Sequence, residues 1–195
     1  DDAHSLGIRF IDEALERRKW AFAADVVRFY AVYTEGGVYM DSDIFLFKRF
    51  DEYIPQEGFV TFNEKDKEER EEFGLQAAFF IGSKGNSFCR EVLDYYKSRP
   101  FVNADGSLND TISPFVMTEV AKRHGFVCRD ERQDLDCLTT YPTRLLMPRK
   151  RFARSADTFA MHRVYGSWRK RKFSRRIELT VTHWINVVRY ALLRR

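Results

Sequence analysis

Two aspartates two residues apart, Asp41 and Asp43, are the residues whose types and spacing most clearly predict chemistry. They lie within an otherwise apolar run, residues 38–47, that follows the glycine pair Gly36-Gly37 and predicts a buried strand. Residues two apart in a strand share a face, so we expect both carboxylates to point the same way. Like charges held that close repel unless a cation lies between them, which suits a hard divalent metal with oxygen ligands. Such a metal would in turn hold phosphate.

A second charged pair, Asp25 and Arg28, lies in the helix-forming segment before this strand. They are the only charged residues from Trp20 to Tyr33, and a helix that is apolar nearly all round is expected to be buried. Residues three apart share a helix face. Burying either charge without a partner would cost free energy, because the charge loses its hydration. Two interpretations stay open: the two charges neutralise each other, or they reach a polar ligand above the adjacent strand.

The surrounding sequence alternates between helix and strand patterns. We expect helices over residues 8–33, 87–97 and 113–122, and further strands over residues 59–62, 76–81 and 158–164. Gly36-Gly37 should end the first helix, Asn86 or Ser87 should cap the second, and Ser113 should cap the third. Residues 64–72 hold six acids and three bases, which predicts a solvated loop with the option of acting as a lid. The alternation indicates an α/β domain.

The composition indicates a single folded domain. Its 195 residues are 44% hydrophobic and 15% aromatic, which is enough for a substantial core. Three cysteines, Cys89, Cys128 and Cys137, lack C-x-x-C spacing, which argues against a structural zinc site or a disulfide framework and favours a reducing compartment. The sequence shows no signal peptide and no apolar run of about 18 residues, so we expect no membrane span.

Basic charge is concentrated at the C-terminus. Residues 169–195 carry nine basic residues and one acid, a net +8, whereas the whole chain carries +4. Their apolar residues form one helical stripe: Ile177, Val181, Trp184, Ile185, Val188, Ala191 and Leu192. A basic amphipathic helix suits an anionic membrane surface, and packing on the domain or on a second copy of the chain is the alternative. Nucleic acid is not expected, because no recognition motif accompanies the charges.

Three motifs together resemble a known family. They are Ala24-Asp25-x-x-Arg28, then Gly36-Gly37-Val38-Tyr39-x-Asp41-x-Asp43, and finally Ala160-Met161-His162 with Ser167-Trp168 following. The combination is similar to the DXD-containing glycosyltransferases, which include fungal initiating mannosyltransferases and bacterial capsular polysaccharide transferases, with the large glucosylating toxins as distant relatives. The resemblance leaves the basic tail outside.

This resemblance implies a GT-A type nucleotide-sugar fold and a role for each motif residue. Asp25 and Arg28 would contact the hydroxyls of the donor sugar, and Asp41 would face the ribose and the sugar. Asp43 would bind Mn²⁺ or Mg²⁺ on the diphosphate, with Asp41 and His162 completing the metal site. The other expected substrate contacts are Gly37, Tyr39, Gln76, Ser167 and Trp168, of which Gln76 would lie on the acceptor side.

The implied activity is transfer of a hexose from a UDP- or GDP-sugar to a saccharide or lipid-linked saccharide, with retention of configuration, in capsular or surface polysaccharide synthesis. The family normally begins with a strand that binds the nucleotide base, and none precedes Asp41 here. We therefore expect an N-terminally incomplete catalytic domain over residues 1–168, lacking its first strand, and a helical tail over residues 169–195. The expected location is the cytoplasm, and the alternative is a peripheral position at the inner face of the membrane.

Two other functions stay open. An inactive glycosyltransferase-like domain would act as a membrane-surface binding module through its basic tail. An aspartate-based phosphohydrolase also carries D-x-D after an apolar strand. Its motif usually continues with Thr or Val, whereas Ile44-Phe45 follows here, and the D-x-x-R helix would then have no role.

Overall fold

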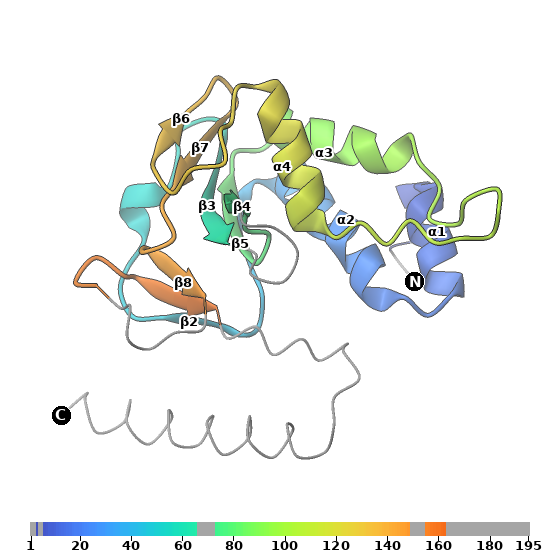
Figure 1. The fold of residues 1–195 in the computed structure, drawn as a ribbon, viewed down its shortest axis with the longest axis horizontal. Helices are drawn as coiled ribbons and strands as arrows, with labels where there is room; N and C mark the ends of the chain where they lie inside the picture. Colours follow the sequence, from blue (N-terminus) through green and yellow to red (C-terminus); the bar gives the residue numbers. More distant parts are fainter. Residues whose placement is uncertain (1–2, 4–5, 66–72, 149–154, 163–195) are drawn as a thin grey trace, which may run out of the picture. The chain divides into compact units, whose positions relative to one another are not determined.

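The computed structural model describes residues 3, 6–65, 73–148 and 155–162, and these residues form a mixed α/β arrangement (Figure 1). The chain divides into two units, residues 1–163 and residues 164–195. The second unit, which holds the expected basic helix, lies outside the described residues, as does most of the charged segment expected as a loop. None of the described helices combines the length and the apolar character needed to cross a lipid bilayer.

Helices pack together beside a sheet (Figure 1). The described helices are α1 (Arg9–Glu16), α2 (Trp20–Glu35), α3 (Ser87–Lys97), α4 (Ser113–Arg123) and the short 3-10 helix η2 (Asp51–Tyr53). The expectation for α3 is confirmed, and the side chain of Asn86 caps it by accepting a hydrogen bond from the Cys89 amide at 2.8 Å. α4 also begins where expected, but its N-cap is Ile112 rather than Ser113.

α1 and α2 replace the single helix expected over residues 8–33, so that prediction was wrong. α1 ends in a Schellman motif, in which the Lys19 amide donates to the Ala14 carbonyl at 2.8 Å. Arg18 takes the left-handed conformation of this motif, with a φ of 55°, and no glycine or proline marks the break in the sequence. Trp20, expected inside a buried helix, is 64% exposed at the start of α2.

Two sheets are present in the described unit. The larger has the order β1-β5-β3-β7-β6, with β4 paired to β3, and within it β3 and β7 run parallel. The smaller has the order β2-β9-β8. The strands are β1 (Gly37–Met40), β2 (Ile44–Leu46), β3 (Phe59–Lys65), β4 (Phe73–Leu75), β5 (Phe79–Gly82), β6 (Gln133–Asp134), β7 (Leu138–Tyr141), β8 (Leu146–Pro148) and β9 (Ala160–His162).

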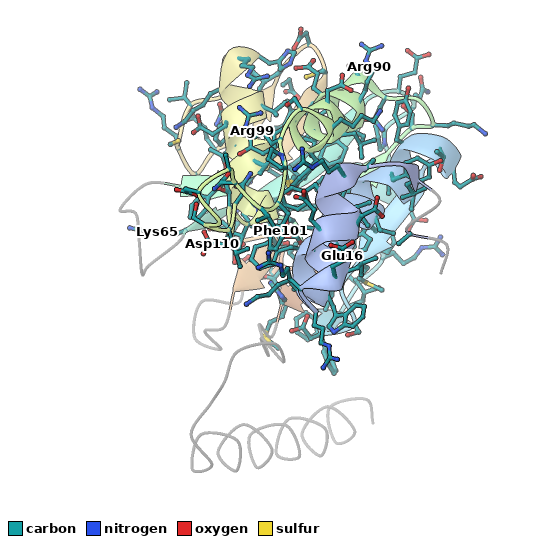
Figure 2. All side chains as sticks on the ribbon, turned by 90° about the vertical axis from the view of Figure 1, so that its right-hand side faces the viewer. Glu16, Lys65, Arg90, Arg99, Phe101 and Asp110 are labelled. Carbon is teal, nitrogen blue, oxygen red and sulfur yellow. The ribbon has the colours of Figure 1, made fainter. Side chains whose placement is uncertain are left out.

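Strand alternation divides the apolar side chains between two cores. In β3, Phe59 packs with the helices, whereas Val60 and Phe62 pack with residues of the smaller sheet. The larger sheet is therefore covered on both faces. Figure 2 views the helical side, where the buried Phe101 meets Phe10 of α1 edge to face at a ring-centroid distance of 5.1 Å. Cys89 and Cys137 are buried and form no disulfide.

Gly36 sets the direction in which the chain leaves α2 for β1. Its amide donates to the Val32 carbonyl at 2.9 Å, which closes the helix, and its φ of 70° and ψ of −178° lie in a region that is essentially restricted to glycine. A Cβ at this position would lie 2.8 Å from the backbone nitrogen of Lys84. The expected helix end at the glycine pair is thus confirmed. Glycine is required at residue 36 for two reasons, the backbone conformation and the close approach of the Lys84 backbone.

We expect Gly36→Ala to lower the free energy of unfolding by about 2 to 3 kcal/mol, because alanine is strained at this φ and ψ and its Cβ meets a backbone atom. Urea denaturation followed by circular dichroism measures the loss. The matched control is Gly106→Ala, which also has a positive φ, 82°, but has open space around a Cβ. It should cost only about 1 kcal/mol, and equal losses in the two variants would contradict the steric argument.

Candidate functional site

The two aspartates lie in a turn that joins the two sheets. β1 ends at Met40, where the Asp41 amide donates to the Ala78 carbonyl at 2.8 Å, and the Ile44 amide donates back to the Asp41 carbonyl at 3.0 Å. The continuous strand expected over residues 38–47 is therefore wrong. The chain leaves the larger sheet at Met40 and enters the smaller one at Ile44, and Asp-Ser-Asp is a sequence that favours such a turn.

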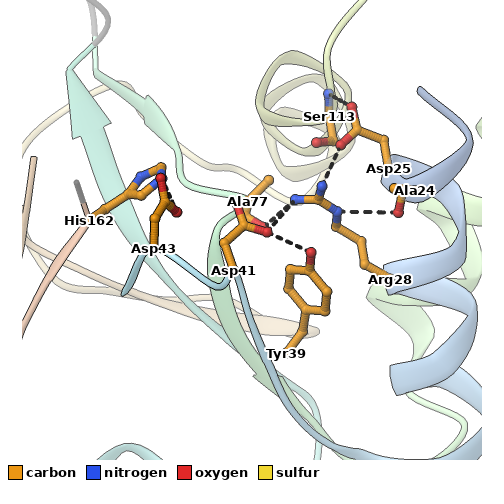
Figure 3. A network of polar contacts seen from close by, with 9 residues as sticks. All are labelled: Ala24, Asp25, Arg28, Tyr39, Asp41, Asp43, Ala77, Ser113 and His162. Atoms are coloured by element: carbon orange, nitrogen blue, oxygen red, sulfur yellow. Dashed lines mark hydrogen bonds and ion pairs between the residues drawn. The ribbon is translucent and has the colours of Figure 1, made fainter. Parts of the chain in front are cut away.

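His162 reaches the same turn from the other end of the chain. It stands opposite Ile44 in the antiparallel β2–β9 register, which brings its ring beside Asp43. The His162 Nε2 lies 3.3 Å from the Asp43 Oδ1, as Figure 3 shows. One potential ligand atom from each of Asp41, Asp43 and His162 lies within 4.8 Å of the other two. The three residues expected to bind metal are thus brought together.

This group of side chains fits a divalent cation. Two carboxylates and one imidazole are a donor set that Mn²⁺ and Mg²⁺ accept, and the side chains of Asp43 and His162 are only 16% and 12% exposed. The Nδ1 of His162 is buried and has no hydrogen-bond partner among the described residues. It is not the ring nitrogen that faces Asp43, so the fit to a cation rests on the donor set and on the burial of Asp43 and His162.

Arg28 connects α2 to the sheet and to the turn (Figure 3). Its Nη2 lies 2.9 Å from the Asp25 Oδ1, and its Nη1 donates to the Ala77 carbonyl at 2.9 Å. The same Nη1 lies 3.6 Å from the Asp41 Oδ1. The pairing of Asp25 with Arg28 is therefore present, and Arg28 also extends toward the strand end, as the second interpretation of this pair required. Contact of either side chain with a sugar stays a prediction.

Asp25 also holds the start of α4. Its Oδ2 accepts a hydrogen bond from the Ser113 amide at 3.2 Å, so a residue far away in the sequence satisfies one of the unpaired N–H groups of that helix. Burial raises the pKa of the Asp25 carboxyl, while the Arg28 charge and the hydrogen bonds from Ser113 act in the opposite direction. Asp25 is thus a carboxylate whose burial depends on its partners.

Tyr39 fixes the orientation of Asp41. Its hydroxyl donates to the Asp41 Oδ1 at 2.6 Å, and the Arg28 guanidinium carbon lies 4.8 Å from its ring centroid. Burial, above all, raises the pKa of Tyr39, so the hydroxyl stays protonated as a donor. The ring stacks on Phe80, which in turn stacks on Phe29 of α2, with centroid distances of 5.1 and 4.9 Å. A column of aromatic rings therefore supports the carboxylate.

The remaining predicted site residues are less closely connected. The strand expected over residues 76–81 begins only at Phe79, so Gln76 lies between β4 and β5. It is fully buried, and both polar atoms of its side chain lack a hydrogen-bond partner among the described residues. Gly37 begins β1 with a φ of 105°. Ser167 and Trp168 lie outside the described residues. The Ala77 carbonyl and the Ser113 amide were missed, because backbone groups leave no signal in a sequence.

Comparison with known proteins identifies the segment that holds most of these residues. Residues 3–60 match the family model described as the glycosyltransferase sugar-binding region containing a DXD motif, which confirms the resemblance carried by the first two motifs. The third motif, residues 160–168, lies outside this match. Among solved structures, the chain is similar to one titled PaToxG Glycosyltransferase, with 22% sequence identity and a TM-score of 0.43. The match covers 58% of this chain and 38% of that chain. No curated protein matches.

Replacing Arg28 by methionine should lower the free energy of unfolding by about 3 kcal/mol, because the largely buried Asp25 carboxylate would lose its partner. Urea denaturation measures this change. The double variant Asp25→Asn/Arg28→Met should recover part of the loss, since no unpaired charge remains buried. As a matched control, Arg90→Met on the exposed face of α3 should change stability by less than about 0.5 kcal/mol. A single variant as stable as the parent would contradict this account of the pair.

Proposed function

Because residues 3–60 match the DXD-containing glycosyltransferase region, we propose that this chain carries a metal-dependent glycosyltransferase site on a GT-A type fold. It transfers a hexose from a nucleotide-diphosphate sugar to a saccharide acceptor, with retention of configuration. One observation carries the proposal. Asp41, Asp43 and His162 converge within 4.8 Å, and the Asp25–Arg28 pair adjoins them through the 3.6 Å approach of Arg28 to Asp41.

The cation that we propose is Mn²⁺ or Mg²⁺, held by Asp43, Asp41 and His162. When bound, it would neutralise the negative charge that develops on the leaving diphosphate. Nucleotide recognition would begin at the same point, because Asp41 is the most exposed of the three charged side chains Asp25, Arg28 and Asp41, with 28% of its side chain accessible. We propose that Asp41 faces the ribose and the sugar.

Two protein groups hold the carboxylate of Asp41 in place. Tyr39 and Arg28 both approach its Oδ1, from the strand and from the helix respectively, so the carboxylate has little freedom to turn. Preorganised charge of this kind favours a transition state because no reorganisation is needed when charge develops. Asp25 offers acceptors and Arg28 offers donors for the hydroxyls of the sugar.

Carboxylates near the anomeric carbon would also favour the positive charge that develops there, as they do in glycoside hydrolysis. We propose retention because the leaving phosphate can take the proton of the acceptor hydroxyl on the same face, so that no separate base is required. Gln76, whose buried amide has no hydrogen-bond partner in the part of the chain that the structure describes, is the proposed contact on the acceptor side. Gly37, Ser167 and Trp168 stay as proposed donor contacts.

The proposed acceptor is a saccharide or lipid-linked saccharide of a capsular or surface polysaccharide, made in the cytoplasm.

The reaction can be tested without the acceptor by screening the hydrolysis of UDP- and GDP-hexoses in the presence of Mn²⁺. We expect one donor to be turned over, and Asp43→Asn to slow that hydrolysis by a factor of about 100 or more, because the leaving group loses its electrostatic stabilisation. Asp94→Asn is the matched control, since this aspartate lies exposed on α3, paired only with Lys97 in the contacts described. It should leave the rate unchanged.

A binding measurement separates a slow enzyme from a wrong assignment. Mn²⁺ together with UDP or GDP should raise the melting temperature of the parent protein, and Asp43→Ala should abolish this rise. If no donor is hydrolysed and no nucleotide diphosphate shifts the melting temperature, the proposed function is wrong. Unchanged hydrolysis in Asp43→Asn would refute the role of the metal site.

A second candidate function rests on the net charge of +8 over residues 169–195. Basic segments bind anionic lipid surfaces at about 1 kcal/mol per charge, and a peripheral membrane location would then follow. We expect the full chain to sediment with vesicles that contain phosphatidylserine, and a chain ending at Trp168 to stay in the supernatant. Vesicles of phosphatidylcholine alone are the control. Equal sedimentation of both forms would refute a role of the tail.

A further inference from the structure

A second group of potential metal ligands lies at the end of α4 and in the connection from β6 to β7. His124 is the residue that ends α4, and Asp136 and Cys137 directly precede β7. One potential ligand atom from each lies within 4.8 Å of the other two. The group shares no residue with the site formed by Asp41, Asp43 and His162, and the proposed transfer reaction does not use it.

Carboxylates hold the His124 ring on both sides. Its Nδ1 lies 3.0 Å from the Asp136 Oδ1, and its Nε2 lies 3.0 Å from each carboxylate oxygen of Glu91 on α3. Both carboxylates can only accept, so without a metal both ring nitrogens carry protons, and the hydrogen bond to Glu91, above all, raises the pKa of His124. A cation would replace the proton on Nδ1, while Nε2 keeps the proton that it donates to Glu91. A carboxylate behind the far nitrogen is the usual partner of a metal-binding imidazole, since it fixes the ring and its tautomer.

The third ligand is a thiol that is protonated without a cation. Burial raises the pKa of Cys137 to about 12, and the nearby charges of Asp136 and Glu91 act in the same direction. A bound divalent ion reverses this balance, because a coordinating thiol is deprotonated. A neutral imidazole, one carboxylate and one thiolate together carry two negative charges, which match the charge of one divalent cation.

We propose that His124, Asp136 and Cys137 form a binding site for Zn²⁺ or a chemically similar transition-metal ion. Sulfur and nitrogen ligands favour zinc over Mg²⁺ or Mn²⁺, whereas the carboxylate-rich site at Asp41 and Asp43 favours the harder ions. Tetrahedral zinc places its ligand atoms about 3.3 to 3.6 Å apart, which the existing cluster accommodates with small shifts. Asp136 is 72% exposed, so water can fill the fourth position.

The spacing argument against zinc does not apply to this site. The spacing of the cysteines concerns sites built from several cysteines, whereas this one combines Cys137 and the adjacent Asp136 with His124 at the end of α4. Bound metal would fasten the end of α4 to the β6–β7 connection, and Glu91 would add α3 to the same assembly. Its expected effect is therefore on stability, since the chemistry of sugar transfer is assigned to other residues.

Cobalt is the probe that tests this site, because a thiolate bound to Co²⁺ gives a charge-transfer absorption in the near ultraviolet. We expect the full-length, reduced, metal-free chain to develop this absorption on addition of one equivalent of Co²⁺, and Zn²⁺ to abolish it by displacement. Asp43→Ala should keep the absorption, since the other metal site contains no thiol. The result is therefore independent of the proposed transferase activity.

Matched variants identify the ligands. Cys137→Ser should abolish the absorption, whereas Cys128→Ser, at a half-buried cysteine outside this group of ligands, should keep it. Asp136→Asn changes a mostly exposed side chain and should weaken Co²⁺ binding at least about 10-fold, and Glu91→Gln should weaken it about 10- to 100-fold. If the parent shows no absorption at saturating Co²⁺, or if Cys137→Ser keeps it, the proposal is overturned, and His124 serves only as an ion-pair link between Glu91 and Asp136.

Discussion

The candidate active site depends on the placement of one positive charge. The Arg28 guanidinium meets Asp25 on its own helix, the Ala77 carbonyl beside the sheet, and Asp41 in the turn between the sheets. Without this charge, two carboxylates would face each other in a partly buried space. A buried ion pair contributes little net stability, because desolvation offsets its attraction, but it can fix the relative position of the elements it joins. Here those elements are α2, the larger sheet and, through Asp25, the start of α4.

Sequence reasoning was sufficient where the cause of the structure is local. Asn86 caps α3 with its own side chain, Gly36 adopts a backbone conformation that only glycine tolerates well, and the three-residue spacing of Asp25 and Arg28 pairs them on one helix face. Each of these features follows from a few neighbouring residues. The grouping of His162 with Asp41 and Asp43 was different, because it was expected only from the resemblance to a family, and the β2–β9 register is what provides it.

Sequence reasoning failed where partners are distant or the pattern is ambiguous. Apolar residues from Val38 to Phe47 fit one long strand, yet the chain changes sheets at Asp41, and nothing in the periodicity distinguishes the two outcomes. Arg18 ends α1 in a conformation usually given to glycine, stabilised by backbone hydrogen bonds that any residue can form. Ser113 was predicted as a cap, but the group that serves α4 is the carboxylate of Asp25.

Because the proposed metal ligands lie at the turn between the sheets, binding of a cation there would depend on how the two sheets are positioned. Asp41 follows the last residue of β1 in the larger sheet, whereas Asp43 directly precedes β2 and His162 ends β9, both strands of the smaller sheet. Any sliding of one sheet across the other would alter the spacing of these three side chains. Thermodynamic linkage would then work in both directions: contacts that hold the sheets in register would strengthen binding of the proposed cation, and the bound cation would oppose separation of the sheets. A substitution in the apolar layer between the sheets would therefore change the affinity of the proposed site for its cation.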